Sequence, residues 1–253
     1  MKNYHTHTPR CKHAIGKEEE YIKAAIEAGY TELGFSDHTP WHYESEYHPT
    51  MRMEETELEG YVNTLSSLRD KYKDRISIKI GLECEYFEEK MDWLKEQLKK
   101  YNLDYIILGN HYDGSDEIGI YYGYPEVSLN ELQRYVSQVL KAMDTGLFSY
   151  VAHPDVVRYD QNNQRHIDEL EKICIHAKEL DIPLEFNLLG YKTMRHYPSE
   201  PFLSLCKKHH NRIIIGTDAH EPEALLDQTT YQRAYNELKQ KGLEITENIK
   251  MLK

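Results

Sequence analysis

The stretch Ile213-Ile214-Ile215-Gly216-Thr217-Asp218-Ala219-His220 joins an apolar, β-branched run to a polar end. Three consecutive isoleucines are typical of a strand that is buried on both faces of a parallel sheet. Asp218 and His220 follow at i and i+2, so on an extended backbone their side chains point to the same face. This segment therefore predicts a buried strand that delivers a carboxylate and an imidazole to one edge of a sheet.

The same arrangement recurs along the chain. Short apolar stretches end at polar residues, and segments with helical spacing of apolar residues separate them. We expect strands at residues 2–5, 33–36, 76–81, 105–108, 148–152, 184–187 and 213–216. We expect helices at residues 18–28, 54–72, 88–100, 128–145, 168–180, 200–209 and 229–241. Ser128, followed by Glu131, predicts a capping box at the start of the fourth helix.

This alternation of strands and helices indicates a parallel sheet with right-handed crossovers. Histidines and carboxylates follow most of the strands, which favours a closed or nearly closed barrel with a site at its carboxyl face. An open, doubly wound sheet is the alternative, and it would gather its ligands at one switch point. The length of 253 residues suits one α/β domain covering residues 1–253.

The composition argues against some classes of function. The chain carries 31 basic and 43 acidic side chains, a net charge of −12, which disfavours a general nucleic-acid or membrane-surface binder. The four cysteines form no C-x-x-C pair, which is typical of reduced thiols, and Cys11 is expected to be a bystander. We see neither a signal segment nor the run of about 20 apolar residues that a membrane span needs, so we expect a cytoplasmic protein.

Pairs of donors at i and i+2 predict a metal site. His5 and His7 share one face of the first strand, as Asp218 and His220 do after the last one. In a barrel the first and last strands are neighbours, so the two pairs should meet. A single histidine at a strand end is more often a hydrogen-bonded surface residue than a ligand, but nine donors at such positions together indicate metal binding. The nine candidate ligands are His5, His7, His13, His38, Glu83, His111, His153, Asp218 and His220.

These motifs, in this order, resemble the PHP (polymerase and histidinol phosphatase) superfamily. The matching motifs are H-x-H at 5–7, S-D-H at 36–38, G-x-E at 81–83, G-x-H at 109–111, A-H-P-D at 152–155 and G-T-D-A-H at 216–220. Within the superfamily, the histidinol-phosphatase branch is the most similar. The resemblance implies a distorted (β/α)7 barrel that holds three divalent metal ions, and imidazole and carboxylate donors suit zinc, manganese or iron.

The resemblance also implies how the ligands are shared. One ion would take His5, His7, Glu83 and Asp218. A second ion would share Glu83 and add His111 and His153. The third ion would take His13, His38 and His220. Glu85 is a near rival to Glu83, but it lies outside the G-x-E motif.

The implied activity is hydrolysis of L-histidinol phosphate to L-histidinol and inorganic phosphate. A hydroxide bridging the ions would attack phosphorus, because metal coordination lowers the pKa of water toward about 7. Asp218 would orient the water or take its proton, with Glu83 and His220 completing the catalytic group. No serine or cysteine nucleophile motif is seen, so we expect no phosphoenzyme.

Two arginines are candidates for phosphate recognition, because guanidinium groups match pairs of phosphate oxygens. Arg158 follows the A-H-P-D motif, and Arg195 lies on the loop after the sixth strand. His42, Asp160 and Asn187 are weaker candidates for holding the rest of the substrate. The Gly- and Tyr-rich segment 113–125 is expected to be a loop or lid over the site.

Two other functions stay open at this level. The same chemistry could serve another phosphomonoester, such as a phosphotyrosine peptide or a nucleotide. The chain could instead be a metal-binding regulatory or storage module without turnover. The intact set of donors and the two arginines favour the enzyme. We expect a small-molecule substrate and neither nucleic acid nor membrane as a partner. The sequence does not indicate the oligomeric state.

Overall fold

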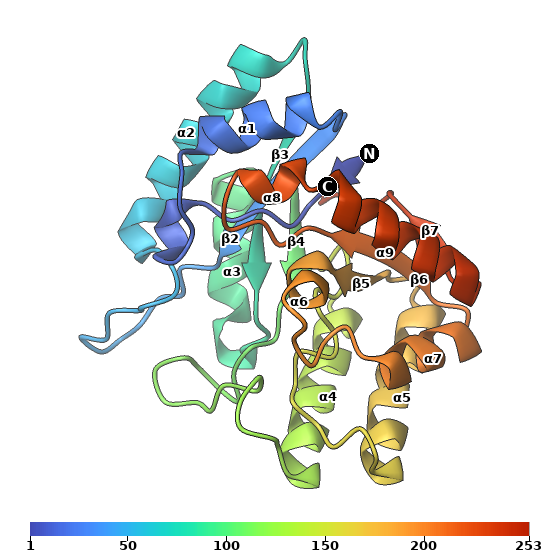
Figure 1. Cartoon of the computed structure of the whole chain (residues 1–253). Helices are drawn as coiled ribbons and strands as arrows, with labels where there is room; N and C mark the ends of the chain where they lie inside the picture. The colour runs from blue at the N-terminus through green and yellow to red at the C-terminus, as the bar shows by residue number, and fades with distance from the viewer. Residues whose placement is uncertain (253) are drawn as a thin grey trace.

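A curled, all-parallel sheet forms the centre of the computed structural model, which describes residues 1–252 (Figure 1). Its first part has the order β1-β2-β3-β4 and its second part the order β5-β6-β7. The first part comprises β1 (Lys2–Asn3), β2 (Glu32–His38), β3 (Ser77–Cys84) and β4 (Tyr105–Leu108). The second part comprises β5 (Leu184–Asn187), β6 (Arg212–Gly216) and β7 (Glu244–Thr246).

The segment between the two parts of the sheet is shorter than the strand predicted at 148–152. Only Val151 makes ladder pairs, with Leu108 on one side and Leu184 on the other. The prediction of a regular strand was therefore wrong, although the segment takes the expected place between β4 and β5. The chain turns away directly afterwards at His153, where φ is 27°.

The sheet closes on itself at its carboxyl end. Thr6 pairs in parallel with Ala219, and the backbone N–H of His7 donates to the Ala219 carbonyl at 2.9 Å. At the amino end β7, which the sequence did not predict, pairs instead with Arg212–Ile214 of β6. The structure therefore confirms the distorted barrel and excludes the open doubly wound sheet.

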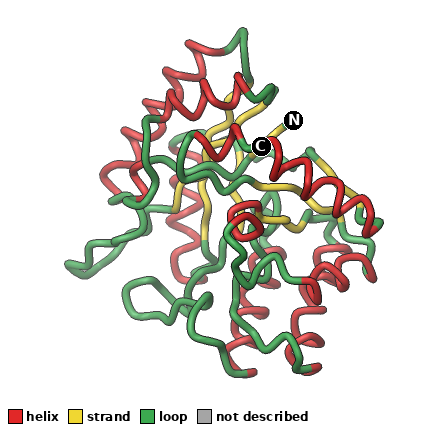
Figure 2. Tube along the Cα trace, in the orientation of Figure 1, coloured by secondary structure: helices red, strands yellow, loops and turns green. Residues whose placement is uncertain are grey.

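Helices surround the strands on the outside (Figure 2). They are α1 (Glu18–Glu27), α2 (Leu58–Tyr72), α3 (Met91–Lys100), α4 (Leu129–Asp144), α5 (Gln164–Glu179), α6 (Leu188–Lys192), α7 (Glu200–Lys208), α8 (Glu223–Leu226) and α9 (Gln228–Lys241). Short 3-10 turns lie at Pro9–Cys11, Glu55–Glu57 and Glu88–Lys90. The capping box of Ser128 and Glu131 is confirmed. α5 begins four residues earlier than predicted, because Asn163 caps it by accepting the N–H of Arg165.

Tyrosines fill the centre of the sheet next to the strand ends. Tyr105 and Tyr150 belong to a buried cluster separate from the main core, and the Tyr105 hydroxyl donates to the Tyr4 carbonyl at 2.8 Å. A β-carbon at Gly81 would lie 2.6 Å from the Tyr105 ring, so only glycine leaves room there. Glu83 lies two residues after Gly81 on β3 and faces the same side of the strand. The tyrosine layer therefore lies directly below the polar side chains that gather at the carboxyl ends of the strands.

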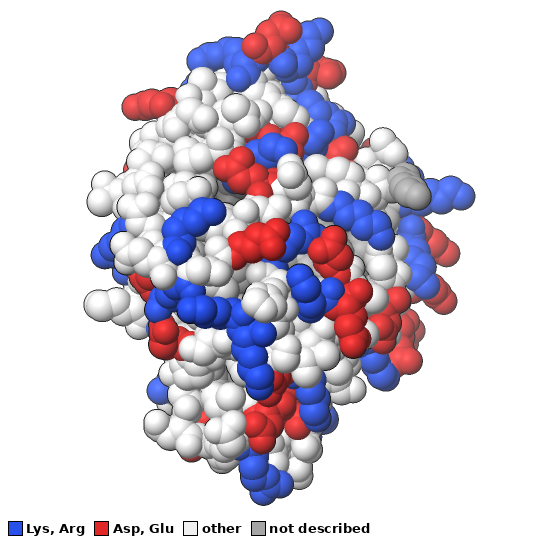
Figure 3. All heavy atoms as spheres, turned by 90° about the vertical axis from the view of Figure 1, so that its right-hand side faces the viewer, with Lys and Arg blue, Asp and Glu red and all other residues white. Residues whose placement is uncertain are grey.

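Charged side chains of both signs are interspersed on the face of the molecule seen in Figure 3. Over residues 1–252, each helix is too short or too polar to cross a bilayer.

Candidate metal centre

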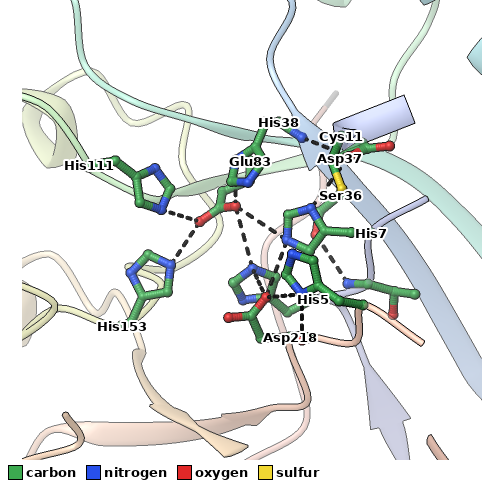
Figure 4. A network of polar contacts seen from close by, with 12 residues as sticks. His5, His7, Cys11, Ser36, Asp37, His38, Glu83, His111, His153 and Asp218 are labelled. Atoms are coloured by element: carbon green, nitrogen blue, oxygen red, sulfur yellow. Dashed lines mark hydrogen bonds and ion pairs between the residues drawn. The ribbon is translucent and has the colours of Figure 1, made fainter. Parts of the chain in front are cut away.

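The strand ends bring all nine predicted donors into one cluster. Glu83, the residue before the last one of β3, lies at the middle of this cluster, with imidazoles on both sides (Figure 4). Oε1 of Glu83 lies 2.8 Å from Nε2 of His153 and 3.3 Å from Nε2 of His111. Oε2 faces a different set of nitrogens at 3.0–3.5 Å, those of His38, His7 and His5. This arrangement suits a carboxylate that bridges two cations.

Asp218, which follows β6, contacts the two histidines that follow β1. Its Oδ1 lies 3.4 Å from Nε2 of His5 and 3.2 Å from Nε2 of His7. The rings of His7 and His220 stack with centroids 4.2 Å apart. The H-x-H pair and the D-x-H pair therefore meet, as the sequence predicted, and the Thr6–Ala219 pairing described above holds them in register.

A third group lies at the open edge of the cluster. Nε2 of His13 and Nε2 of His220 are 2.9 Å apart, and the His38 ring lies 5.6 Å from that of His13. His13 is exposed and His220 is partly exposed, in contrast to the buried donors. The thiol of Cys11 is close to both histidines, near enough for these three to form one possible donor set.

Buried polar atoms without partners indicate what the cluster can hold. His5 Nε2, His7 Nε2, His38 Nδ1 and Glu83 Oε2 are buried and lack hydrogen bonds. Buried polar groups are nearly always hydrogen-bonded, so several that converge on one space fit a cation there. Several triads, including His5–His7–Glu83 and His5–His153–Asp218, place their ligand atoms within 4.8 Å of one another. The residues therefore fit several divalent ions.

The protonation states of His38, His220, Glu83 and Asp218 suit cation binding. Burial alone would lower the pKa of His5 and His7, but the surrounding carboxylates raise the pKa of both rings well above the usual value, where a cation would replace the proton. Burial lowers the pKa of His38 well below its usual value, and burial with the nearby His7 lowers that of His220 to about 3. Both rings are neutral at pH 7, the form that binds metals. Burial alone would raise the pKa of Glu83 and Asp218, but the surrounding imidazoles hold both pKa values well below the usual range. Both carboxylates are therefore ionised.

Carboxylates behind the cluster orient three of the rings. Nδ1 of His5 lies 2.8 Å from Glu185, and Nδ1 of His111 lies 3.2 Å from Glu85. Asp37 faces Nδ1 of His7 in the same way, at 3.4 Å. Such partners fix a ring so that its other nitrogen points to the metal. These three roles were not predicted from the sequence, although Asp37 lies within the S-D-H motif and Glu85 lies two residues after Glu83.

The cluster forms one wall of a cavity of about 520 Å³. Eight of the nine donors line it, all except His5. Arg195 lies on another wall and donates from Nη1 to the Tyr197 hydroxyl at 2.7 Å. Tyr112, just before the loop expected to cover the site, and Tyr121, within that loop, line the cavity as well. The cavity thus offers a cation-binding face, and a guanidinium with one of its nitrogens bonded to Tyr197, to one small anionic ligand.

The other four predicted substrate contacts lie outside the lining. His42 is exposed and pairs with Glu55 at 2.6 Å, and Arg158 is exposed with its guanidinium over the Tyr124 ring. Asp160 accepts the Asn162 N–H in its own loop. Asn187 is buried below the site, where Nδ2 donates to Glu185 and Asp218 and Oδ1 caps α6. The structure gives these four side chains other partners and does not place them in the cavity lining, so their contact with a substrate stays a prediction.

Comparison with known proteins places the chain in a family. A model of the PHP domain matches residues 3–188, so the chain belongs to the PHP domain family, as the motifs predicted.

Two relatives are similar over most of their length. The histidinol-phosphatase of Bacillus subtilis is 26% identical, over 86% of this chain and 92% of the relative. A Deinococcus radiodurans protein named "Probable histidinol-phosphatase" is 28% identical, over 86% of this chain and 85% of the relative. Histidinol phosphate phosphatase from Lactococcus lactis, solved with zinc, L-histidinol and phosphate, shares the fold with a TM-score of 0.72. That structure is 21% identical and covers 100% of this chain and 98% of its own.

Proposed function

We propose that this protein is a metal-dependent phosphomonoesterase that hydrolyses L-histidinol phosphate to L-histidinol and phosphate. The observation that carries the proposal is the convergence of nine nitrogen and carboxylate donors, eight of which line a cavity that Arg195 also lines. Two relatives that match over 85% or more of both chains support the choice of substrate, because both are named as histidinol-phosphatases, one of them as probable.

Under this proposal the nine donors hold three ions, with Glu83 shared. The first ion would be held by His5, His7, Glu83 and Asp218. The second would be held by Glu83, His111 and His153. The third would be held by His13, His38 and His220. The contacts of the two Glu83 oxygens support the separation of the first two ions, because Oε1 faces His111 and His153 while Oε2 faces His5 and His7. Oε2 also lies 3.0 Å from Nδ1 of His38, so the third ion would lie next to the first.

When bound, such ions supply an activated water at neutral pH and offset negative charge on phosphoryl oxygens. Asp218 is ionised and keeps Oδ2 fixed by the Asn187 amide, so it can orient a water or accept its proton. Arg195 lines the same cavity and can offer two N–H groups in one plane to the phosphate. Tyr197 holds one nitrogen of that guanidinium and thereby limits its movement.

The proposed domain extends over residues 1–253, beyond the end of the family match at residue 188. Asp218 and His220 lie after that point, and β6 completes the barrel that brings them to His5 and His7. The expectations of a cytoplasmic location and of no nucleic-acid partner stay predictions.

The test is phosphate release from histidinol phosphate, a phosphotyrosine peptide and a nucleotide, with metal content measured on the same sample. We expect the largest kcat/KM for histidinol phosphate. A faster reaction with another phosphomonoester would replace the substrate and keep the chemistry. Metal-loaded protein that releases phosphate from none of them would favour a binding module without turnover.

A further inference from the structure

A buried arginine lies behind the metal centre, and the proposed chemistry does not use it. Arg52 has an exposed fraction of 0%. Its Nη1 and Nη2 donate to the two oxygens of Glu85 at 3.0 and 2.8 Å, a bidentate pair. Nη1 also donates to the Thr39 carbonyl at 2.9 Å, and Nε donates to Asp116 at 2.7 Å. All three guanidinium nitrogens are thus engaged, and the position of the group is defined.

Glu85, whose position Arg52 fixes, in turn contacts His111, a proposed metal ligand. Oε1 of Glu85, which accepts from Arg52, lies 3.2 Å from Nδ1 of His111. The other oxygen accepts from the Trp41 indole at 2.9 Å. Nε2 of the same histidine faces Glu83 at 3.3 Å. A continuous line of polar contacts therefore runs from the guanidinium through Glu85 and the imidazole to the shared carboxylate.

We propose that Arg52 is a positioning residue for the metal centre. It holds Glu85 in one orientation through the bidentate pair, so that Glu85 keeps the His111 ring with Nδ1–H directed to it and Nε2 directed to the proposed ion. Without the arginine, the Glu85 carboxylate would lose the fixed geometry of that pair and could rotate toward another donor, such as the Trp41 indole. Such a rotation would remove the acceptor that fixes the ring, and the second ion would lose an oriented ligand.

A second role of Arg52 competes with this explanation. Asp116 belongs to the 113–125 loop and accepts both Nε of Arg52 and the Tyr43 hydroxyl, so the arginine also joins two loops that project on the same side of the molecule (Figure 1). Met51 and Tyr112, which line the cavity, contact each other beside this joint, with the hydroxyl 2.8 Å from the sulfur. Loop anchoring alone would make the arginine structural, and the experiment has to separate the two roles.

Arg52→Lys keeps the charge but cannot make the bidentate pair. We expect a folded variant in which one ion per chain is held about 10- to 100-fold more weakly, as for other residues that orient a ligand. Metal content after dialysis against a graded chelator measures this, and the absorption spectrum of the Co²⁺-loaded protein reports the change at the imidazole. Arg69→Lys is the matched control, because Arg69 pairs with Asp104 away from the cavity.

Two further variants decide between the roles. Asp116→Asn weakens the contact with the loop, because an amide oxygen is a poorer acceptor for a guanidinium than a carboxylate is, and it leaves the Arg52–Glu85–His111 line in place, so it should hold all ions as the parent does. Glu85→Gln should weaken the same ion as Arg52→Lys, and the double variant should be no worse than the more damaged single one, because both act along one line. Normal metal affinity in Arg52→Lys, or an equal loss in Asp116→Asn, would overturn the inference.

The inference deepens the proposed function and rests on its ligand assignment. Metal affinity is measured without substrate, however. A wrong substrate would leave the result of this test unchanged, so the two failures are distinguishable.

Discussion

Gly109 lies directly against Glu83. A β-carbon at position 109 would be 2.0 Å from Oε1 of Glu83, the oxygen that faces His111 and His153. No side chain fits this space, and the nearest atoms belong to the carboxylate that the proposed ions share. The glycine of the G-x-H motif is therefore required by the shape of the site.

Replacing Gly109 with alanine should displace the Glu83 carboxylate and disable the metal centre. We expect at least two ions per chain to be lost, and kcat/KM for phosphate release to fall by about 100-fold or more, as when a central catalytic contact is removed. Metal analysis and steady-state kinetics measure both effects.

Gly60→Ala is the control for that substitution. Gly60 lies within α2, where an added β-carbon meets nothing within 4 Å, so alanine should stabilise the helix by about 0.5–1 kcal/mol and leave the site intact. If Gly109→Ala kept full metal content and activity, the bridging role of Glu83 would have to be given up.

Glu185 should matter although it is not among the proposed ligands. It accepts Nδ1–H of His5 through Oε1 and the backbone N–H of His153 through Oε2. Glu185→Gln keeps the shape and weakens both contacts, so we expect a loss of about 10- to 100-fold in metal affinity or activity. Glu237→Gln serves as the comparison, since Glu237 bonds the Tyr191 hydroxyl outside the cavity lining. Equal behaviour of the two variants would count against the orienting role.

Residues near each other in sequence were predicted better than contacts across the fold. The donors after each strand could be found because they interrupt apolar runs, and the family and the barrel are confirmed. The partnership of His5 with Glu185 joins positions 180 residues apart, and no local pattern reveals it. Asn187 looked like a substrate contact because it follows a strand, but its side chain caps the short α6 that the sequence did not predict. The sequence pattern predicts that a residue lies at the carboxyl end of a strand. Whether its side chain faces the cavity depends on packing against residues that are distant in the sequence.

Substitution of the two candidate arginines should affect kcat/KM to different extents. Arg195 lines the cavity, whereas the guanidinium of Arg158 lies over the Tyr124 ring and outside the lining. Arg195→Lys should lower kcat/KM by about 10- to 100-fold, chiefly through KM, because the planar fork is lost. Arg158→Lys should change it by about twofold or less, as substitutions at ordinary surface positions do. Steady-state kinetics with histidinol phosphate compares the two directly, and a larger effect at position 158 would show that the substrate binds elsewhere.

Removing the metal should lower thermal stability as well as activity. The buried donors then face one another without the cation that offsets their charge, and two carboxylates, Glu83 and Asp218, stay ionised among them. A ligand that is present at about 100 times its Kd stabilises the folded state by about 2.7 kcal/mol, which corresponds to roughly 5–10 °C in Tm for a chain of this size. Differential scanning calorimetry before and after chelation should show this shift, and added Zn²⁺ or Mn²⁺ should reverse it.

The control for metal removal is Glu83→Gln, which should lose most of the Tm difference, because one amide oxygen cannot serve two ions as a carboxylate does. A Tm that is the same with and without metal in the parent protein would mean that the cluster does not hold ions in the folded state. Activity that survives complete chelation would contradict the proposed chemistry in the same experiment, since no residue of the cavity other than the metal ligands is placed to activate water.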